Sequence, residues 1–188
     1  MNKPRKSSIG DLALIALFVA LLALCSYINI PLGGANITLQ LFGVYLCIFC
    51  LGAKKGLGSI AVYVLGGTIG LPLFSGFTWG LSVILGPFGG YIIGFIPSAL
   101  ICTFLLRILG KTKAKLFISA LISLPFCYLI GTLWYCGVYL GDLTPQRFTS
   151  VLPICVLPYV IPDVLKLIGA SILGNKINKI LSNSKKGV

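Results

Sequence analysis

The sequence contains no histidine, and its only acidic residues are Asp11, Asp142 and Asp163. Most metal sites, catalytic triads and general acid–base pairs are built from histidine or from clustered carboxylates. We therefore expect no catalytic site, no metal site and no cofactor. The chain also lacks the phosphate-binding pattern Gly-x-x-x-x-Gly-Lys-Ser/Thr, so any ATP-driven activity would require a partner protein.

Charge of either sign is scarce: 10% of the 188 residues are charged, whereas 57% are apolar. A bilayer core of about 30 Å takes about 20 apolar residues per helix, and apolar blocks recur along this whole chain. The sequence therefore predicts an all-α integral membrane protein with one domain, residues 1–188, that forms a six-transmembrane-helix bundle. The predicted helices are residues 9–30, 37–53, 57–74, 87–109, 116–140 and 162–180, with a short broken outer segment at 148–161.

Lysine and arginine are concentrated in every second gap between these predicted helices, for example at Lys54 and Lys55 and between Arg107 and Lys115. By the positive-inside rule, both termini are predicted to be cytoplasmic, and the gaps near residues 31–36, 75–80 and 141–150 face outward. The net charge of +12 then reflects orientation in the membrane and contact with anionic lipid. We expect no nucleic-acid partner.

Seven cysteines are present, and two of them form a Cys-x-x-Cys pattern at Cys47 and Cys50. Metal or redox chemistry of this type usually involves a second pair or histidine, and the chain offers neither. The other cysteines are scattered through apolar blocks, where cysteine packs as a small apolar group. We interpret all seven as packing residues.

The stretch "LGPFGGYIIGF" places Gly86, Gly90 and Gly94 four residues apart, on one face of a helix that another backbone can approach closely. Pro87 suits the first turn of that helix. The preceding residues, 70–86, then form a long outward loop that contains Trp79 and lies over a cavity as a lid. The alternative is that these glycines serve only packing and that Trp79 is an interfacial anchor.

In the first helix, Ala16 and Ala20 form a smooth stripe on which another helix can dock. Internal packing of the bundle is the alternative explanation for this spacing.

Asp163 and Lys166 lie in the apolar run "LPYVIPDVLKLIGASILG", and their i, i+3 spacing puts them on one helix face. Pro162 suits the first turn of a helix, where the helix dipole favours a carboxylate. Ionisable residues at membrane depth are costly unless they face a partner or a cavity, so this pair is a candidate functional site. The alternative is an ion pair that only fixes helix packing.

Three stretches resemble, in order and spacing, the BioY family of biotin-specific S components of energy-coupling factor (ECF) transporters. They are residues 36–76, "LGPFGGYIIGF" and "LPYVIPDVLK", and the resemblance extends from Ala16 to about Gly174. It implies a six-helix protein of the bacterial plasma membrane that captures a vitamin from outside. It also implies three partners: a membrane coupling subunit and two cytoplasmic ATPase subunits that hydrolyse ATP.

By this resemblance, Asp163 and Lys166 match the acid and base that hold the ligand, and Ala16 and Ala20 match the motif that docks on the coupling subunit. A carboxylate suits the urea N–H groups of biotin, and an ammonium suits either the urea oxygen or the carboxylate tail. With the outward loop and the glycine-rich element, the candidate ligand-binding residues are Asp163, Lys166, Thr78, Trp79, Gly90 and Tyr91.

Three departures from the family pattern bear on the ligand: Pro162 before the acid, Phe77-Thr78-Trp79 in the loop, and Ile92 where some members have an arginine. A different small carboxylate with a ring, such as lipoate, therefore stays open as an alternative ligand. A self-sufficient channel or a structural membrane protein is the alternative function. It would need a polar pathway across the full membrane depth, but the helices offer one charged cluster.

Overall fold

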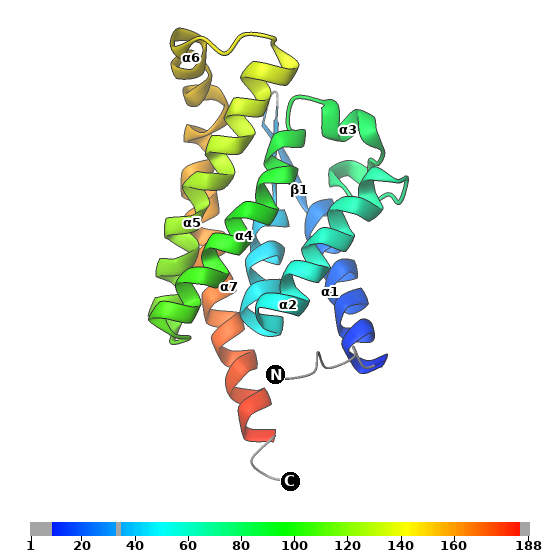
Figure 1. Cartoon of the computed structure of the whole chain (residues 1–188), viewed down its shortest axis with the longest axis vertical. Helices are drawn as coiled ribbons and strands as arrows, with labels where there is room; N and C mark the ends of the chain where they lie inside the picture. Colours follow the sequence, from blue (N-terminus) through cyan, green and yellow to red (C-terminus); the bar gives the residue numbers. More distant parts are fainter. Residues whose placement is uncertain (1–8, 33–34, 185–188) are drawn as a thin grey trace, which may run out of the picture.

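The computed structural model describes residues 9–32 and 35–184, without the side chains at positions 32, 35 and 181–184. Five long helices form an elongated bundle (Figure 1). They are α1 (Ile9–Tyr27), α2 (Gln40–Thr68), α4 (Gly89–Leu109), α5 (Lys113–Trp134), which continues as a π-helical turn over Tyr135–Tyr139, and α7 (Leu157–Ser184). Each is long and apolar enough to cross a membrane.

Helix α2 covers most of two predicted helices, 37–53 and 57–74, and it is broken at Gly52. The sequence predicts this break at residues 54–56, but the structure puts it at Gly52, whose φ of 74° glycine adopts without the steric cost that other residues meet. The two halves fold back on each other closely: a Cβ at Gly56 would lie 2.7 Å from the carbonyl oxygen of Cys47. Lys55 lies just after the break and forms an ion pair with Asp11 of α1.

Short elements fill one end of the bundle, opposite the end where α1 starts and α7 finishes (Figure 1). An antiparallel hairpin of β1 (Asn29–Leu32) and β2 (Ala35–Thr38) replaces the end of the predicted helix 9–30. A 3₁₀ turn (Ser75–Phe77) and α3 (Leu81–Leu85) occupy the segment between α2 and α4. Here α2 ends at Thr68, where the sequence predicts helix to residue 74.

The predicted broken segment at 148–161 is largely helical. It contains most of α6 (Pro145–Cys155) and the start of α7, which begins at Leu157 and not at residue 162. Pro162 lies inside α7, where it removes one backbone hydrogen bond near the start of the helix without ending it. Thr144 caps α6 by accepting a hydrogen bond from the backbone N–H of Arg147.

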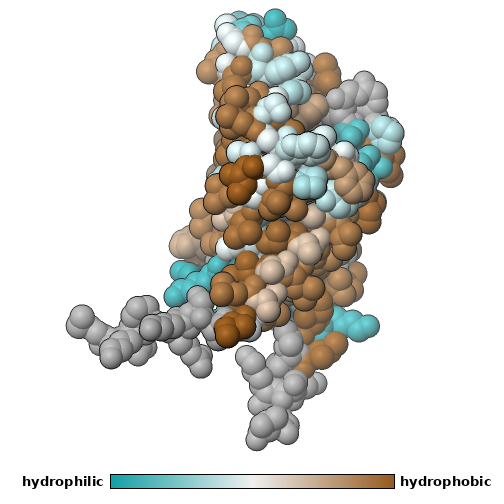
Figure 2. Space-filling model, turned by 90° about the vertical axis from the view of Figure 1, so that its right-hand side faces the viewer, coloured by the Kyte–Doolittle hydropathy of each residue, from teal (hydrophilic) through white to brown (hydrophobic). Residues whose placement is uncertain are grey.

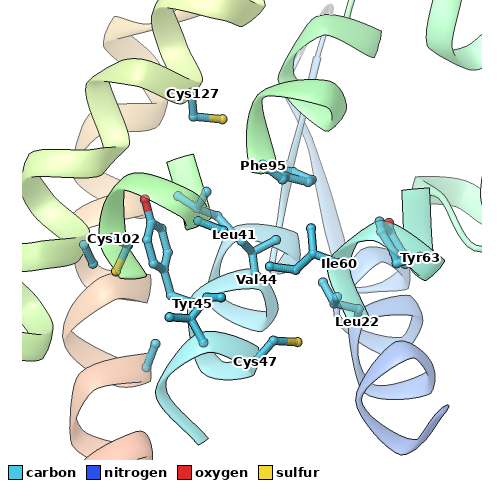
Figure 3. Packing of buried hydrophobic residues seen from close by; sticks show 14 of the residues in the cluster. Leu22, Leu41, Val44, Tyr45, Cys47, Ile60, Tyr63, Phe95, Cys102 and Cys127 are labelled. Carbon is cyan, nitrogen blue, oxygen red and sulfur yellow. The ribbon is translucent and has the colours of Figure 1, made fainter. Parts of the chain in front are cut away.

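The core lies between α2, α4 and α5, where buried side chains from these helices meet around Tyr45 (Figure 3). The hydroxyl of Tyr45 lies 2.8 Å from that of Ser98 on α4 and 2.9 Å from that of Ser123 on α5. This network satisfies polar groups that have no access to water. On the outer surface, apolar residues cover most of the face drawn in Figure 2, as expected for contact with lipid.

Helices α4 and α5 pack closely through the predicted glycine stripe. A Cβ at Gly90 would lie 2.1 Å from the Cβ of Trp134, and one at Gly94 would lie 3.1 Å from the carbonyl oxygen of Cys127. Gly86 is not part of this contact, because it caps α3 before α4 begins. Two of the three glycines therefore act as the spacing predicts. All seven cysteines are free thiols, and Cys50 alone is only half-buried.

Candidate ligand-binding site

A cavity of about 310 Å³ lies at the end of the bundle that carries the hairpin, α3 and α6. Its walls come from β2, the start of α2, the 74–78 loop, α3, the start of α4, the second half of α5, the end of α6 and the first turns of α7. This volume is at the lower end of the range of about 300 to 1,000 Å³ for small-molecule sites. Most of the wall is apolar, with polar groups gathered on two sides.

The first polar group is the pair Asp163 and Lys166 on α7. The Lys166 ammonium donates a hydrogen bond to Asp163 Oδ1 at 2.5 Å, and both side chains are less than a tenth exposed. The hydroxyl of Tyr128 on α5 donates to the other oxygen, Oδ2, at 2.6 Å. The acid is therefore held from two sides, by its own helix and by α5.

The pair keeps capacity for a ligand. Each carboxylate oxygen of Asp163 has a second lone-pair site, and the Lys166 ammonium has two further N–H donors. Donor and acceptor lie side by side at the cavity wall, and their charges cancel. Such a pair can bind a neutral group that offers both N–H and C=O, with no net charge added to an apolar site.

The second polar group comes from β2, α2 and the 74–78 loop, and it contains Thr38, Gln40, Ser75 and Thr78. Thr38 donates to the Gln40 side-chain oxygen at 3.0 Å, and Gln40 Nε2 donates to the Tyr63 hydroxyl at 2.7 Å. Thr78 donates to the Ser75 carbonyl at 2.9 Å, but the Ser75 hydroxyl is buried with no hydrogen-bond partner among the described residues.

Of the six candidate residues that the sequence indicates, the structure brings four to the cavity wall: Asp163, Lys166, Thr78 and Tyr91. The Tyr91 hydroxyl lies 3.2 Å from that of Thr132 and 3.4 Å from the carbonyl of Cys155, to which it donates.

The other two candidates lie elsewhere. Trp79 is 55% exposed and does not line the cavity. Gly90 faces α5, where the side chain of Trp134 fills the space beside it. The structure thus gives Gly90 a packing position, because a Cβ there would collide with α5.

Ala16 and Ala20 lie on α1, and both are exposed. They are not part of the internal packing of the described chain. The smooth stripe on α1 is therefore open to the surroundings.

Sequence reasoning missed several cavity residues, above all Tyr128, Gln40, Thr38 and Ser75. Gln40 carries a usable signal, because it is an uncharged polar residue at the start of an apolar block. Tyr128 carries none: tyrosine is common in membrane helices, and only the packing of α5 against α7 brings its hydroxyl to Asp163.

The model of the family described as "BioY family" matches residues 1–183. The chain belongs to the BioY family. It is 38% identical over 167 residues to the probable biotin transporter BioY of Pyrococcus horikoshii, with 89% of this chain and 95% of that protein covered. It is 34% identical to the biotin transporter BioY of Thermotoga maritima, with coverage of 87% and 93%.

The fold is also similar to that of a solved structure, the S-component for biotin from an ECF-type ABC transporter. The TM-score is 0.79, the sequence identity is 22%, and 95% of each chain is covered. The bundle thus has the fold of an ECF S component. A BioY family member whose described residues include five apolar helices of spanning length is a multi-pass protein of the plasma membrane, in a family of transporters and not of enzymes.

Proposed function

We propose that this protein captures biotin from outside the cell and serves as the substrate-specific S component of an ECF transporter. BioY relatives that match nearly the whole chain are named as biotin transporters. A membrane coupling subunit and two ATPase subunits provide the energy, because the chain has no Walker-type motif of its own.

The observation that carries this proposal is the buried Asp163–Lys166 pair at the wall of a cavity in an otherwise apolar bundle. Biotin contains a cyclic urea, with two N–H donors next to a carbonyl acceptor. The Asp163 carboxylate accepts from the urea N–H groups, and the Lys166 ammonium donates to the urea oxygen. Tyr128 keeps the carboxylate oriented toward the cavity.

Placing the urea at the pair also avoids a charge penalty. If the ligand carboxylate bound there instead, Lys166 would have to serve two carboxylates, and one negative charge would stay unbalanced in an apolar site. Lipoate, the alternative ligand, has a carboxylate but no urea, so it gains little from this pair. The apolar ring of biotin contacts the apolar wall, which includes Ile92 and Phe95.

The topology we propose has six spans with both termini cytoplasmic. Each half of α2, on either side of Gly52, crosses the membrane once. The turn between α4 and α5 is at the same end as this break, because Lys111 Nζ would lie 3.8 Å from a Cβ at Gly52. Both positions are next to basic residues, as the positive-inside rule requires of cytoplasmic turns. The cavity then opens to the outside.

Docking of the coupling subunit on α1 is part of the same proposal. Ala16 and Ala20 are exposed and small, so a partner helix can approach the α1 backbone closely at this stripe.

Titration of the purified full chain with biotin and with lipoate tests the ligand. We expect saturable biotin binding, with lipoate at least tenfold weaker; tighter binding of lipoate would overturn the assignment. Uptake of labelled biotin by cells with and without the coupling and ATPase subunits tests the transporter class. Equal uptake in both, at a rate that does not saturate with biotin, would instead identify a channel.

Thiol labelling tests the topology. A cysteine at Leu143, which is 64% exposed, should react with a membrane-impermeant reagent in intact cells. A cysteine at Lys113 should react only after permeabilisation, and the unmodified chain gives the background of the native thiols. Outside labelling at position 113 would overturn the proposed orientation.

A further inference from the structure

Within the described part of the chain, the cavity has no cationic group available for the tail of a ligand. Among the described residues that line it, Asp163 and Lys166 are the only charged ones, and they are paired at 2.5 Å. Ile92, whose side chain is 7% exposed, contributes only apolar surface. A carboxylate that enters this cavity therefore finds no unpaired positive charge on the lining residues that the structure describes.

The second polar group lies on another side of the cavity from the ion pair. Asp163 and Lys166 are on α7 and are contacted from α5, whereas Ser75 and Thr78 belong to the segment that leads into α3. Figure 1 shows α5 and the first turns of α7 at the left of the bundle and α3 at the right. Apolar residues, among them Leu41 and Phe95, line the space between the two polar groups. This arrangement fits a ligand with two polar ends and an apolar middle.

The second polar group is uncharged, and it offers both hydrogen-bond donors and acceptors. The Ser75 hydroxyl has no partner among the described residues, and Gln40 Nε2 has a second N–H beyond the one given to Tyr63. Thr38 and Thr78 each use their hydroxyl proton within the protein. The Thr78 oxygen is left as an acceptor, whereas the Thr38 oxygen already accepts from the backbone N–H of Gln40 at 3.4 Å and keeps one further lone pair. A carboxylate can use the donors, and an amide can use both donors and acceptors.

Thr78 is also exposed, so this side of the cavity is in contact with water. A carboxylate there keeps part of its hydration and needs no buried counter-charge. An uncharged tail can bind at the same place, because none of the four side chains of the second polar group carries a charge that the tail would have to neutralise.

We infer that Thr38, Gln40, Ser75 and Thr78 form a neutral tail site, and that the protein therefore binds biotin and its neutral tail amide with similar affinity. This inference rests on the proposed function, because it assumes that the urea of the ligand occupies the Asp163–Lys166 pair. It defines the substrate class as cyclic ureas with an apolar arm that ends in either a carboxylate or an amide.

Calorimetric titration of the full chain with biotin and with biotinamide at the same pH tests the inference. We expect dissociation constants that differ by less than tenfold. A biotinamide constant ten or more times larger than that of biotin would show that a cation recognises the carboxylate, and it would overturn the inference while the proposed function stands. Failure to bind biotin at all would overturn the proposed function and the inference with it.

A matched pair of variants locates the tail site. Ser75→Ala removes the unpartnered hydroxyl, and we expect it to weaken both ligands, by about 2- to 10-fold for the neutral amide and by more for the carboxylate, whose hydrogen bond is charge-assisted. Ser119→Ala is the control, because the Ser119 hydroxyl is likewise buried and unpartnered among the described residues but does not line the cavity. An unchanged affinity in Ser75→Ala, or a loss confined to biotin, would overturn the assignment of Ser75 to a neutral site.

Discussion

The Asp163–Lys166 pair offers the most direct test of the site, through Asp163→Asn, Lys166→Met and the double variant. Asp163→Asn keeps the size of the side chain and removes its charge. Lys166→Met keeps most of the unbranched stem and removes the ammonium. Each single change leaves the other residue without its oppositely charged partner, in a position that is less than a tenth exposed.

The magnitude follows from the contacts that are lost. A hydrogen bond to a charged group contributes about 1.5 to 3 kcal/mol, and an unsatisfied ligand group in a dry site adds to the cost. We therefore expect each single variant to lose about 2 to 4 kcal/mol of biotin binding, or roughly 30- to 1000-fold in affinity. Stranding one member of a buried pair also destabilises the fold, whereas the double variant recovers much of that stability.

The double variant separates a ligand site from a structural ion pair. A ligand site predicts that its melting temperature returns toward wild type while its biotin affinity stays low, because neither charged group is present to meet the urea. A purely structural pair predicts near-normal affinity once the stability is restored. Calorimetric titration and thermal melting of the three variants distinguish these outcomes, and biotin affinity close to wild type in the double variant would refute our reasoning.

Three further predictions concern neighbouring features. Tyr128→Phe should weaken biotin binding about 2- to 10-fold in the same titration with little effect on melting, because Asp163 Oδ2 loses one hydrogen bond but Lys166 still holds Oδ1. Gly90→Ala should lower the melting temperature because its Cβ would lie 2.1 Å from Trp134, whereas Gly58→Ala, with ordinary contact at 3.6 Å, should leave it equal or higher. Ala20→Trp should block copurification of the coupling subunit while biotin binding persists. Leu24→Trp is the control and should assemble normally, because the side chain at this position is already large and 59% exposed. Normal assembly of Ala20→Trp would contradict docking at this stripe.

Much of this protein follows from its sequence because lipid imposes strict limits on a chain. In the bilayer every backbone polar group must be satisfied internally, so long apolar blocks become helices. Glycine at Gly90 and Gly94 predicts close helix contact, since no other residue lets two backbones approach as closely. The spacing of Asp163 and Lys166 likewise predicts a shared helix face, and the pair lies on one face of α7.

The helix boundaries at the outer end were not predicted correctly, because apolar residues do not stop where the helices end. Isoleucine and leucine continue into β1 after Tyr27 and through residues 69–74 after α2, so the apolar blocks extend beyond the helices. Hairpin pairing and packing against neighbouring elements decide where these helices stop. The break in α2 lies at Gly52 and not at the predicted residues 54–56. Lys54 and Lys55 mark the membrane boundary, but the turn itself needs a positive φ, which glycine adopts without steric cost.

The sequence alone determined the membrane class, the helix faces and the buried acid–base pair, because these depend on residue type and on spacing along one helix. The tertiary structure decided what surrounds the pair. Tyr128 meets Asp163 because α5 packs on α7, and Gln40 reaches the cavity because the hairpin leads the chain into α2. Tyr128 and Gln40 are 35 and 123 positions from Asp163 along the chain, and no local pattern relates residues so far apart.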